Sequence, residues 1–314
     1  MPDTVPADHA PPVADTPAPL PPPPPLAAKA TDLEALRSAV VDAATVGAGL
    51  WLSYLFVLFY LLVAAGSVTH RDLLLQSPIK LPFLSVDLPL VGFFVLGPAI
   101  FLVVHAYVLL HFVLLAIKVI AFDGELGAQI DDADVRARLR RQLPSNIFVQ
   151  YLAGPREVRH GEIGWLLRAI ALTTLVFAPI ALLGFFALQF LPYHDAAVTW
   201  WQRIAVLIDL ALLWTLWPQI AGRRTAPPGG IGRRIFTYGG GVLASACVLL
   251  LVFVVGTTAA ERLNRLNSAP PLDAVYSALI AGDVDFASQK PTSLWSNRLV
   301  LPGFNAGTGA EPPR

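Results

Sequence analysis

The chain of 314 residues is 55% hydrophobic and only 14% charged, and its mean hydropathy is +0.61. Soluble domains are about 45–50% apolar and about 25% charged, so this composition excludes an ordinary soluble protein. The 22 basic and 22 acidic residues cancel and indicate no nucleic-acid partner, and the single cysteine, Cys247, excludes an intrachain disulfide framework. We therefore predict an all-α, polytopic membrane protein.

The N-terminal segment is rich in proline, with five prolines in a row at 21–25 and no basic residue before Lys29. Such a stretch cannot bury a core, and it lacks the basic start and apolar core of a signal peptide. We expect 1–30 to be a disordered tail, with a docking site for a proline-binding partner as the alternative. The sequence TDLE at 31–34 matches a capping box and predicts that the first helix starts at Thr31.

Long apolar stretches then recur along the chain, each long enough to cross a hydrocarbon core of about 30 Å. Prolines and charges interrupt the apolar segment 73–89, so we expect it to be ordered but not to span. The second stretch would be roughly 50 Å long as a helix, and Gly97-Pro98 should kink it or mark its entry into the bilayer. The five predicted spans are 46–68, 90–122, 163–191, 198–219 and 235–256, which together define a helical membrane domain of residues 31–256.

Basic residues are distributed unevenly over the connections between these spans. Fourteen of the 22 belong to the predicted inner segments: Lys29 and Arg37 near the N-terminus, eight from Lys118 to Arg168 in and beside the loop 123–162, and four from Arg223 to Arg234 in the fourth connection. Because basic residues stay on the cytoplasmic side, we predict a cytoplasmic N-terminus and a largely irregular extracytoplasmic tail at 257–314. Eighteen arginines against four lysines, with abundant Ala, Leu and Pro, are typical of a GC-rich bacterial genome, and a bacterial inner membrane is the expected location.

The cytoplasmic loop contains a predicted charged helix at 123–144, with acids at its start and arginines at its end. This order complements the helix dipole, and the arginines would face either solvent or anionic headgroups. Asp131, Asp132 and Asp134 resemble part of a calcium loop, but the glycine and the terminal glutamate of that motif are missing.

Asp209 lies near the middle of the fourth predicted span, where a carboxylate costs several kcal/mol unless it is paired, protonated or hydrated. Its candidate partners are His105 and His111 on the second span. A proton relay or ion site is one hypothesis, and a buried hydrogen bond that locks two helices together is the alternative. On the fifth span, Gly240/Ala244 and Gly241/Ser245 place small residues four apart, which permits close helix packing or reflects simple tolerance of small residues.

Motifs of soluble catalysis, phosphate binding and metal binding are missing from the chain, so we predict no enzyme, no cofactor and no metal site. His194-Asp195 would be the interfacial pair of a lipid-acting enzyme, but the surrounding PYHDAAVTWW is typical of a turn between helices. We expect a membrane anchor or scaffold with protein partners or a homo-oligomer. The alternative is a small transporter or proton-coupled channel that uses Asp209 and a second-span histidine.

Three segments carry a resemblance to a known family: 81–111, FLPYHDAAVTWWQRIAVLIDLALLWTLWP at 190–218, and WSNRLVLPGF at 295–304. They are similar to the membrane region that precedes the repeats in bacterial pentapeptide-repeat proteins, over residues 45–304. The resemblance implies a multi-span module that normally carries a right-handed, four-sided β-helix after its last span. This chain departs from the pattern, because only one repeat-like unit, VDFAS at 284–288, is present.

Overall fold

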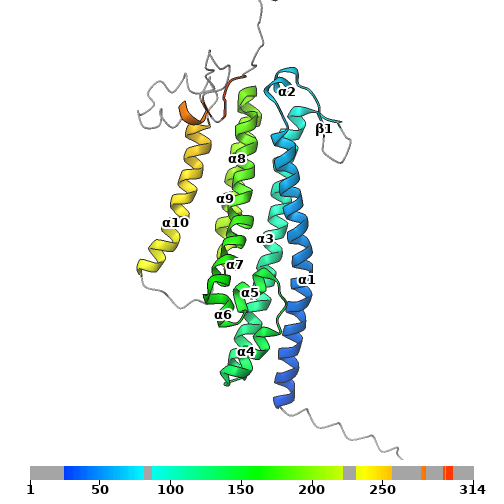
Figure 1. Ribbon diagram of the computed structural model, residues 1–314, viewed down its shortest axis with the longest axis vertical. Coiled ribbons are helices and arrows are strands. Elements are labelled where there is room, and N and C mark those ends of the chain that lie inside the picture. The colour runs from blue at the N-terminus through cyan, green and yellow to red at the C-terminus, as the bar shows by residue number, and fades with distance from the viewer. Residues whose placement is uncertain are drawn as a thin grey trace, which may run out of the picture.

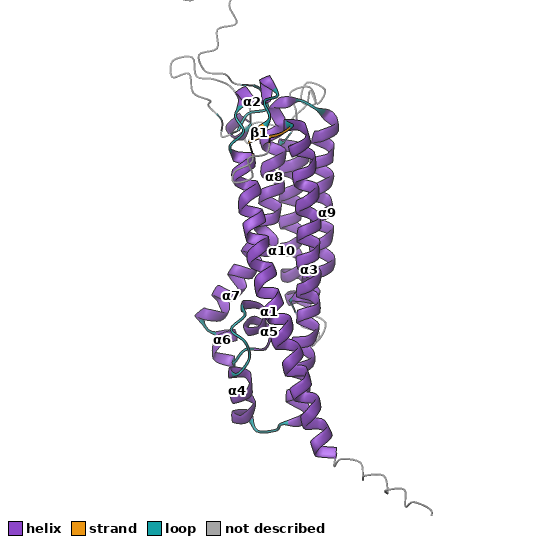
Figure 2. Ribbon diagram, turned by 90° about the vertical axis from the view of Figure 1, so that its right-hand side faces the viewer, coloured by secondary structure: helices purple, strands orange, loops and turns teal. Residues whose placement is uncertain are grey.

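The computed structural model describes residues 25–80, 87–221, 231–256, 277–280, 293 and 295–299. Long helices run side by side along one axis and form an elongated bundle (Figures 1 and 2). The predicted all-α membrane fold is therefore confirmed. Residues 1–24 and most of 257–314, on which the predicted tails fall, lie outside the described residues.

The long helices account for most of the described chain. They are α1 (Pro25–Gly66), α3 (Leu90–Gln129), α7 (Glu162–Leu172), α8 (Ala178–Phe190), α9 (Ala196–Ile220) and α10 (Ile231–Leu250). A π-helical segment, η1 (Thr173–Phe177), joins α7 to α8, and a second, η4 (Leu251–Val255), extends α10. The short elements are α2 (His70–Leu75), β1 (Ile79–Lys80), β2 (Asp87–Leu88), α4 (Ala133–Arg141), α5 (Ile147–Ala153), α6 (Arg156–His160) and the 3-10 turn η2 (Leu191–Tyr193).

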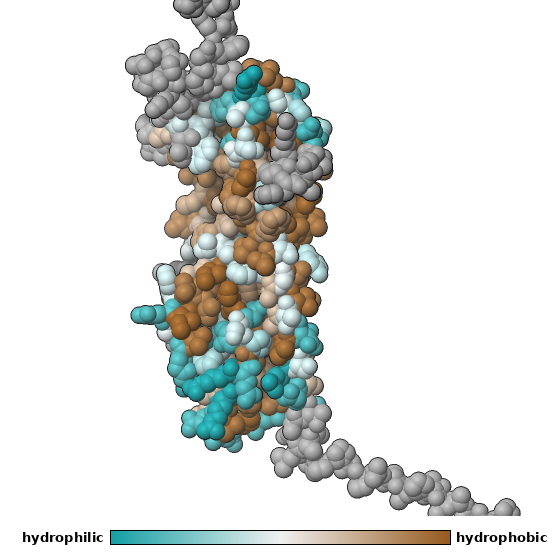
Figure 3. All heavy atoms as spheres, turned by 45° about the vertical axis from the view of Figure 1, so that its right-hand side comes forward, coloured by the Kyte–Doolittle hydropathy of each residue, from teal (hydrophilic) through white to brown (hydrophobic). Residues whose placement is uncertain are grey.

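Within the part of the chain that the structure describes, four helices are long and apolar enough to cross a membrane: Asp32–Gly66, Leu90–Gln129, Glu162–Tyr193 and Ala196–Ile220. The fifth predicted span is also helical, but its apolar part, Gly239–Phe253, is shorter than the other four. On the face shown in Figure 3, apolar side chains form a broad band over the upper and middle parts of the bundle, and hydrophilic side chains gather below it at the lower end. The protein is therefore a multi-pass membrane protein with four to five apolar helices.

The predicted start of the first helix at Thr31 is wrong, because α1 begins at Pro25. The residues before Thr31 read LAAKA, and these good helix formers carry the helix through it. A capping box does occur at Thr69, where the side chains of Thr69 and Asp72 bond each other's backbone amides at the start of α2. The hydrogen bonds from Thr69 hold the pKa of Asp72 below its ordinary value.

The single charged helix predicted at 123–144 is also wrong, because α3 continues to Gln129 and α4 begins only at Ala133. Leu126 on the extra turns is fully buried, so packing extends α3 beyond the predicted end at 122. Asp132 then caps α4 by accepting from the amides of Asp134 (2.8 Å) and Val135 (3.4 Å). The predicted charge order holds within α4 itself, which has an acid in its first turn and arginines in its last.

The segment 73–89 is not a helical span over its described residues. It contains the end of α2 and a two-stranded antiparallel ladder that pairs Ile79 with Leu88 and Lys80 with Asp87. Residues 81–86 lie outside the described chain. Prolines and charges prevent a membrane helix here, as the sequence indicated.

Two helices extend well beyond the apolar band. At 1.5 Å per residue, the 42 residues of α1 and the 40 residues of α3 are each about 60 Å long, twice a hydrocarbon core of about 30 Å. Their charged ends, 32–42 and 118–129, lie at the lower end of the molecule together with α4, α5 and α6 (Figure 1). There α3 contacts α5, and Arg140 on α4 donates to Asp123 on α3. We call this charged region the basal extension.

The basal extension packs against the adjoining part of the bundle. The Phe148 ring on α5 lies 3.9 Å from the Phe112 ring on α3, and Val149 and Ala153 are fully buried. The Asn146 amide donates to the Ala44 carbonyl on α1 (3.0 Å). These contacts make the basal extension a folded continuation of the bundle.

Candidate functional site

A buried carboxylate and a buried imidazole meet at the centre of the bundle. Asp209 Oδ1 on α9 lies 2.6 Å from His105 Nδ1 on α3, and both side chains are completely buried. His111, the other candidate partner, lies elsewhere: its Nε2 is 3.2 Å from the Ala43 carbonyl on α1. The two histidines are six residues apart on α3, which places them on different helix faces.

The protonation of this pair follows from its contacts. His105 Nε2 lies 3.3 Å from the Leu175 carbonyl, which can only accept, so Nε2 carries a hydrogen. The short contact between Nδ1 and Oδ1 then requires a second hydrogen between those two atoms. The pair as a whole is therefore neutral, whichever partner holds that hydrogen, and neutrality reduces the cost of burying it in a membrane protein.

Pro179 explains why two backbone carbonyls beside His105 and Tyr54 have no donor within their own helix. A helical carbonyl normally accepts from the amide four residues later, and for Leu175 that position is Pro179, which has no N–H. In the π-helical segment the Ala178 amide bonds to the Thr173 carbonyl, so the Thr174 carbonyl is freed as well. Carbonyls freed within a membrane helix need donors from neighbouring helices.

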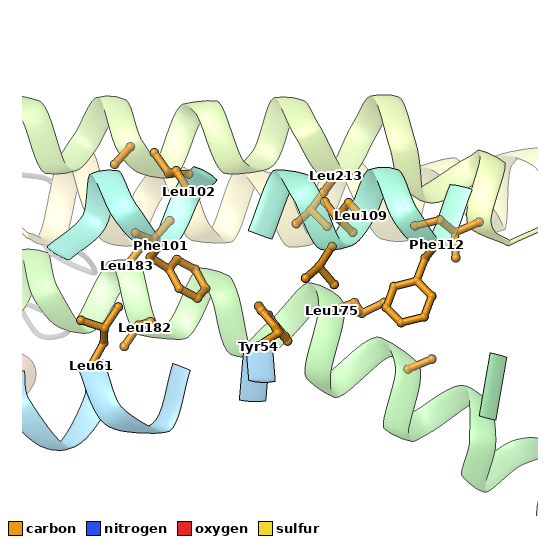
Figure 4. Close-up of a cluster of buried hydrophobic side chains, with 14 of the residues drawn as sticks. Tyr54, Leu61, Phe101, Leu102, Leu109, Phe112, Leu175, Leu182, Leu183 and Leu213 are labelled. Carbon is orange, nitrogen blue, oxygen red and sulfur yellow. The ribbon is translucent and has the colours of Figure 1, made fainter. Parts of the chain in front are cut away.

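The second freed carbonyl, that of Thr174, accepts a hydrogen bond from a side chain of α1. The Tyr54 hydroxyl donates to the Thr174 carbonyl (2.8 Å), and its ring stacks on His105 with centroids 5.6 Å apart. Figure 4 shows Tyr54 projecting between Phe101 of α3 and Leu175. We call Tyr54, His105, Asp209 and the Leu175 and Thr174 carbonyls the central clamp. It connects α1, α3, α9 and the α7–α8 helix at one level.

Closer to the other end of the bundle, side chains of a neighbouring helix also donate to carbonyls near a second proline. Pro98 lies inside α3 and removes the amide that would bond to the Phe94 carbonyl. The buried Gln202 on α9 donates to that carbonyl (3.4 Å), and the Trp201 indole donates to the Val95 carbonyl (3.0 Å). The preceding Gly97 lies close to Phe186, since a Cβ there would be 2.8 Å from the ring.

Arg203 is a basic residue that is only 2% exposed within the bundle. Its Nη2 donates to the Gly256 carbonyl (3.1 Å), and its guanidinium lies 5.0 Å from the Trp200 ring and 5.7 Å from the Phe253 ring. Arg203 therefore links α9 to the residue that follows η4. The hydropathy pattern does not mark Gln202 or Arg203 as buried, whereas the missing amide hydrogen of Pro98 indicates that a carbonyl on α3 needs another donor.

The small residues predicted for helix packing lie where α10 meets α9. The Trp214 indole donates to Ser245 Oγ (3.0 Å), and a Cβ at Gly241 would lie 3.4 Å from the Trp214 ring. All four small residues line a cavity between α8, α9 and α10, and a Cβ at Gly240 would meet nothing within 4 Å.

His194 and Asp195 form part of the turn before α9, as the sequence pattern indicated. Asp195 caps α9 by accepting from the Val198 amide (3.1 Å). His194 adopts a left-handed conformation with φ 62°, and its Nε2 lies 2.6 Å from the Asn297 carbonyl. Both side chains thus have contacts that order the turn and the C-terminal segment beside it.

Among the described residues, no group of three or more His, Cys, Asp or Glu side chains could hold a metal ion. Comparisons of the chain with protein families, curated proteins and solved structures found no match. The function must therefore be argued from the geometry of this molecule.

Proposed function

We propose that this protein is a membrane anchor or scaffold, whose basal extension binds a protein partner. The observation that carries the proposal is the continuation of α1 and α3 beyond the apolar band into a folded, charged region. Helices that only crossed a bilayer would need about 20 residues each, so the additional turns serve another purpose.

The exposed surface of α4 is the part of the basal extension best suited to a partner. Arg140 donates from Nε (2.9 Å) and Nη2 (2.7 Å) to Asp123 Oδ1, which fixes α4 on α3. Arg138 and Arg141 are three residues apart, share one face and are exposed, and Val135 beside them is 40% exposed. A rigid basic surface with an apolar residue favours a partner with an acidic surface and an apolar anchor.

The central clamp supports the same proposal. It bonds α1, α3, α9 and the α7–α8 helix to one another inside the bundle, which suits a rigid support. By the distribution of basic residues, the basal extension would lie in the cytoplasm and the other end outside it. A bacterial inner membrane and a relationship to the membrane region of pentapeptide-repeat proteins are parts of this proposal.

The test is site-specific crosslinking in native membranes. A photoreactive amino acid placed at Val135 is expected to give a discrete adduct with one protein partner. The double variant Arg138→Glu/Arg141→Glu should abolish this adduct, because it reverses the charge of the exposed face. Arg71→Glu, which changes another exposed arginine near the opposite end of the molecule, is the matched control and should leave the adduct unchanged.

Two results would contradict the scaffold proposal. One is an absence of any discrete adduct from Val135 and from neighbouring exposed positions of α4. The other is an adduct that persists in the charge-reversed variant, because the partner would then not recognise the basic face.

A second candidate function is proton-coupled transport through the central clamp. One observation favours it: Asp209 Oδ2 is buried and has no hydrogen-bond partner among the described residues. A carboxylate oxygen in that position could accept a proton or coordinate a cation. The complete burial of both Asp209 and His105 argues for the structural role, because an ion must reach the site.

Asp209→Asn separates the two candidates. The amide keeps a hydrogen bond to His105 but cannot exchange a proton, so a transporter would lose its proton flux in liposomes. The scaffold proposal expects the variant to give the same flux as the original protein and the same Val135 adduct.

A further inference from the structure

An apolar cavity of about 320 Å³ lies between the α7–α8 helix, α9 and α10. This volume is at the lower end of the range of small-molecule sites, about 300–1,000 Å³. Its walls include Val176, Ile180, Leu213, Trp217, Ala244 and Val248. The cavity takes no part in the central clamp or the basal extension.

The cavity is apolar and opens towards the side of the bundle. Its one hydroxyl, on Ser245, already accepts from the Trp214 indole. Phe177 is 57% exposed and Trp214 is 40% exposed, so the wall faces the surroundings of the helices. A polar solute would find few partners here, whereas a hydrocarbon chain matches the walls.

The cavity begins just inside a basic boundary of the membrane region. On α7, Arg168 is the last charged residue before the apolar run, and Leu172 one turn later lines the cavity. Arg168 is exposed, with its guanidinium 5.7 Å from the Tyr151 ring.

The described contacts of α10 with α9 lie beside the cavity, and the described side chains do not fill it. The helix is bonded to α9 at Trp214–Ser245 and, beyond its end, at Arg203–Gly256, and the cavity lies alongside. In Figure 1, α10 stands apart from α8 over most of its length. Unfilled space between helices forfeits dispersion contacts, so an occupant would stabilise the arrangement.

We propose that this cavity binds one acyl chain of an anionic phospholipid, with the phosphate at Arg168. The surrounding bilayer supplies the hydrocarbon chain, and the basic boundary supplies the charge that selects the headgroup. The site would bind lipid whether or not the basal extension has a protein partner.

Photolabelling tests the proposal. The full-length protein is reconstituted in phosphatidylcholine vesicles containing phosphatidylglycerol with a diazirine in one acyl chain, and adducts are mapped by mass spectrometry. We expect adducts on Phe177, Trp214 and Val248. Ala244→Phe, which fills the cavity, should abolish them. Leu243→Phe, on the neighbouring exposed position of α10, is the matched control and should not.

The headgroup is tested with the same diazirine chain on phosphatidylcholine. One arginine near the membrane surface contributes about 1 kcal/mol, so we expect about fivefold weaker labelling of the cavity by the neutral lipid. Arg168→Gln should remove this difference. Adducts on Leu52 and Val103, which are 68% and 71% exposed, report bulk lipid and confirm that each variant is folded in the membrane.

Three outcomes would overturn the proposal. Cavity labelling no stronger than labelling of Leu52 would mean that lipid contacts all faces alike. Cavity labelling unchanged by Ala244→Phe would place the chain elsewhere. A crosslink between two copies at Trp214 in place of the lipid adduct would show that a second copy fills the cavity.

Discussion

The bundle of α1, α3, α8 and α9 and the single helix α10 are both apolar, yet they are held in very different ways. Buried polar contacts and stacked rings join the four bundle helices at the central clamp and at Pro98. The contacts that hold α10 and its extension to α9 include the Trp214–Ser245 bond and the contact of Arg203 with Gly256. Apolar surface alone does not drive membrane helices together, because lipid is equally apolar. Packing and hydrogen bonds therefore decide which helices form the rigid part.

The largest expected effect comes from the central clamp. Asp209→Ala leaves His105 Nδ1 without its acceptor in a fully buried position, and breaking a buried pair in this way costs about 3 kcal/mol. We expect this loss in the free energy of unfolding, measured in bicelles with increasing SDS. Asp209→Asn, which keeps a hydrogen bond, should lose far less. Equal losses in the two variants would mean that the hydrogen bond contributes little to the bundle.

The next effect tests the packing of α3 against α8. Gly97→Ala places a Cβ 2.8 Å from the Phe186 ring, and overpacking of this kind costs about 1–3 kcal/mol. Gly124→Ala on the same helix meets nothing within 4 Å and should stabilise by about 0.5–1 kcal/mol through helix propensity. The same unfolding measurement compares them, and opposite signs are the expected result.

A smaller effect tests the role of Gln202 beside Pro98. Gln202→Leu should cost about 1 kcal/mol, since the Phe94 carbonyl loses its donor. Pro98→Ala restores an amide to α3, so Gln202→Leu should cost less in that background. A double-mutant cycle in unfolding free energy measures the coupling, and additive effects would separate Gln202 from the proline.

The smallest effect concerns α10. Ser245→Ala removes the bond from Trp214 and should change the global unfolding free energy by no more than about 0.6 kcal/mol. The local effect should be larger: a spin label on the single cysteine, Cys247 on α10, should become more mobile in this variant. The matched variant Thr215→Ala, which removes a bond within α9 only, should leave the label unchanged.

The sequence identified the carboxylate of the candidate site but not how it is satisfied. Asp209 was evident because a charge in an apolar stretch needs a partner, and two histidines were the candidates within reach. Which histidine meets Asp209 depends on how α3 is rotated against α9. Tyr54 was evident only as one aromatic among several, since its acceptor is a backbone carbonyl 120 positions away.

Hydropathy and charge by themselves determined the membrane class, the helical fold and the approximate spans, because these depend on composition over short windows. The ends of the helices were harder to predict from the sequence. For example, α3 continues to Gln129 because Leu126 is buried. Pro98 and Pro179 have no amide hydrogen, so helix carbonyls near them lose their usual donors. Only the tertiary structure decided that Gln202 satisfies one of them, and His105 and Tyr54 the others, because a donor is chosen by the helix that packs beside it.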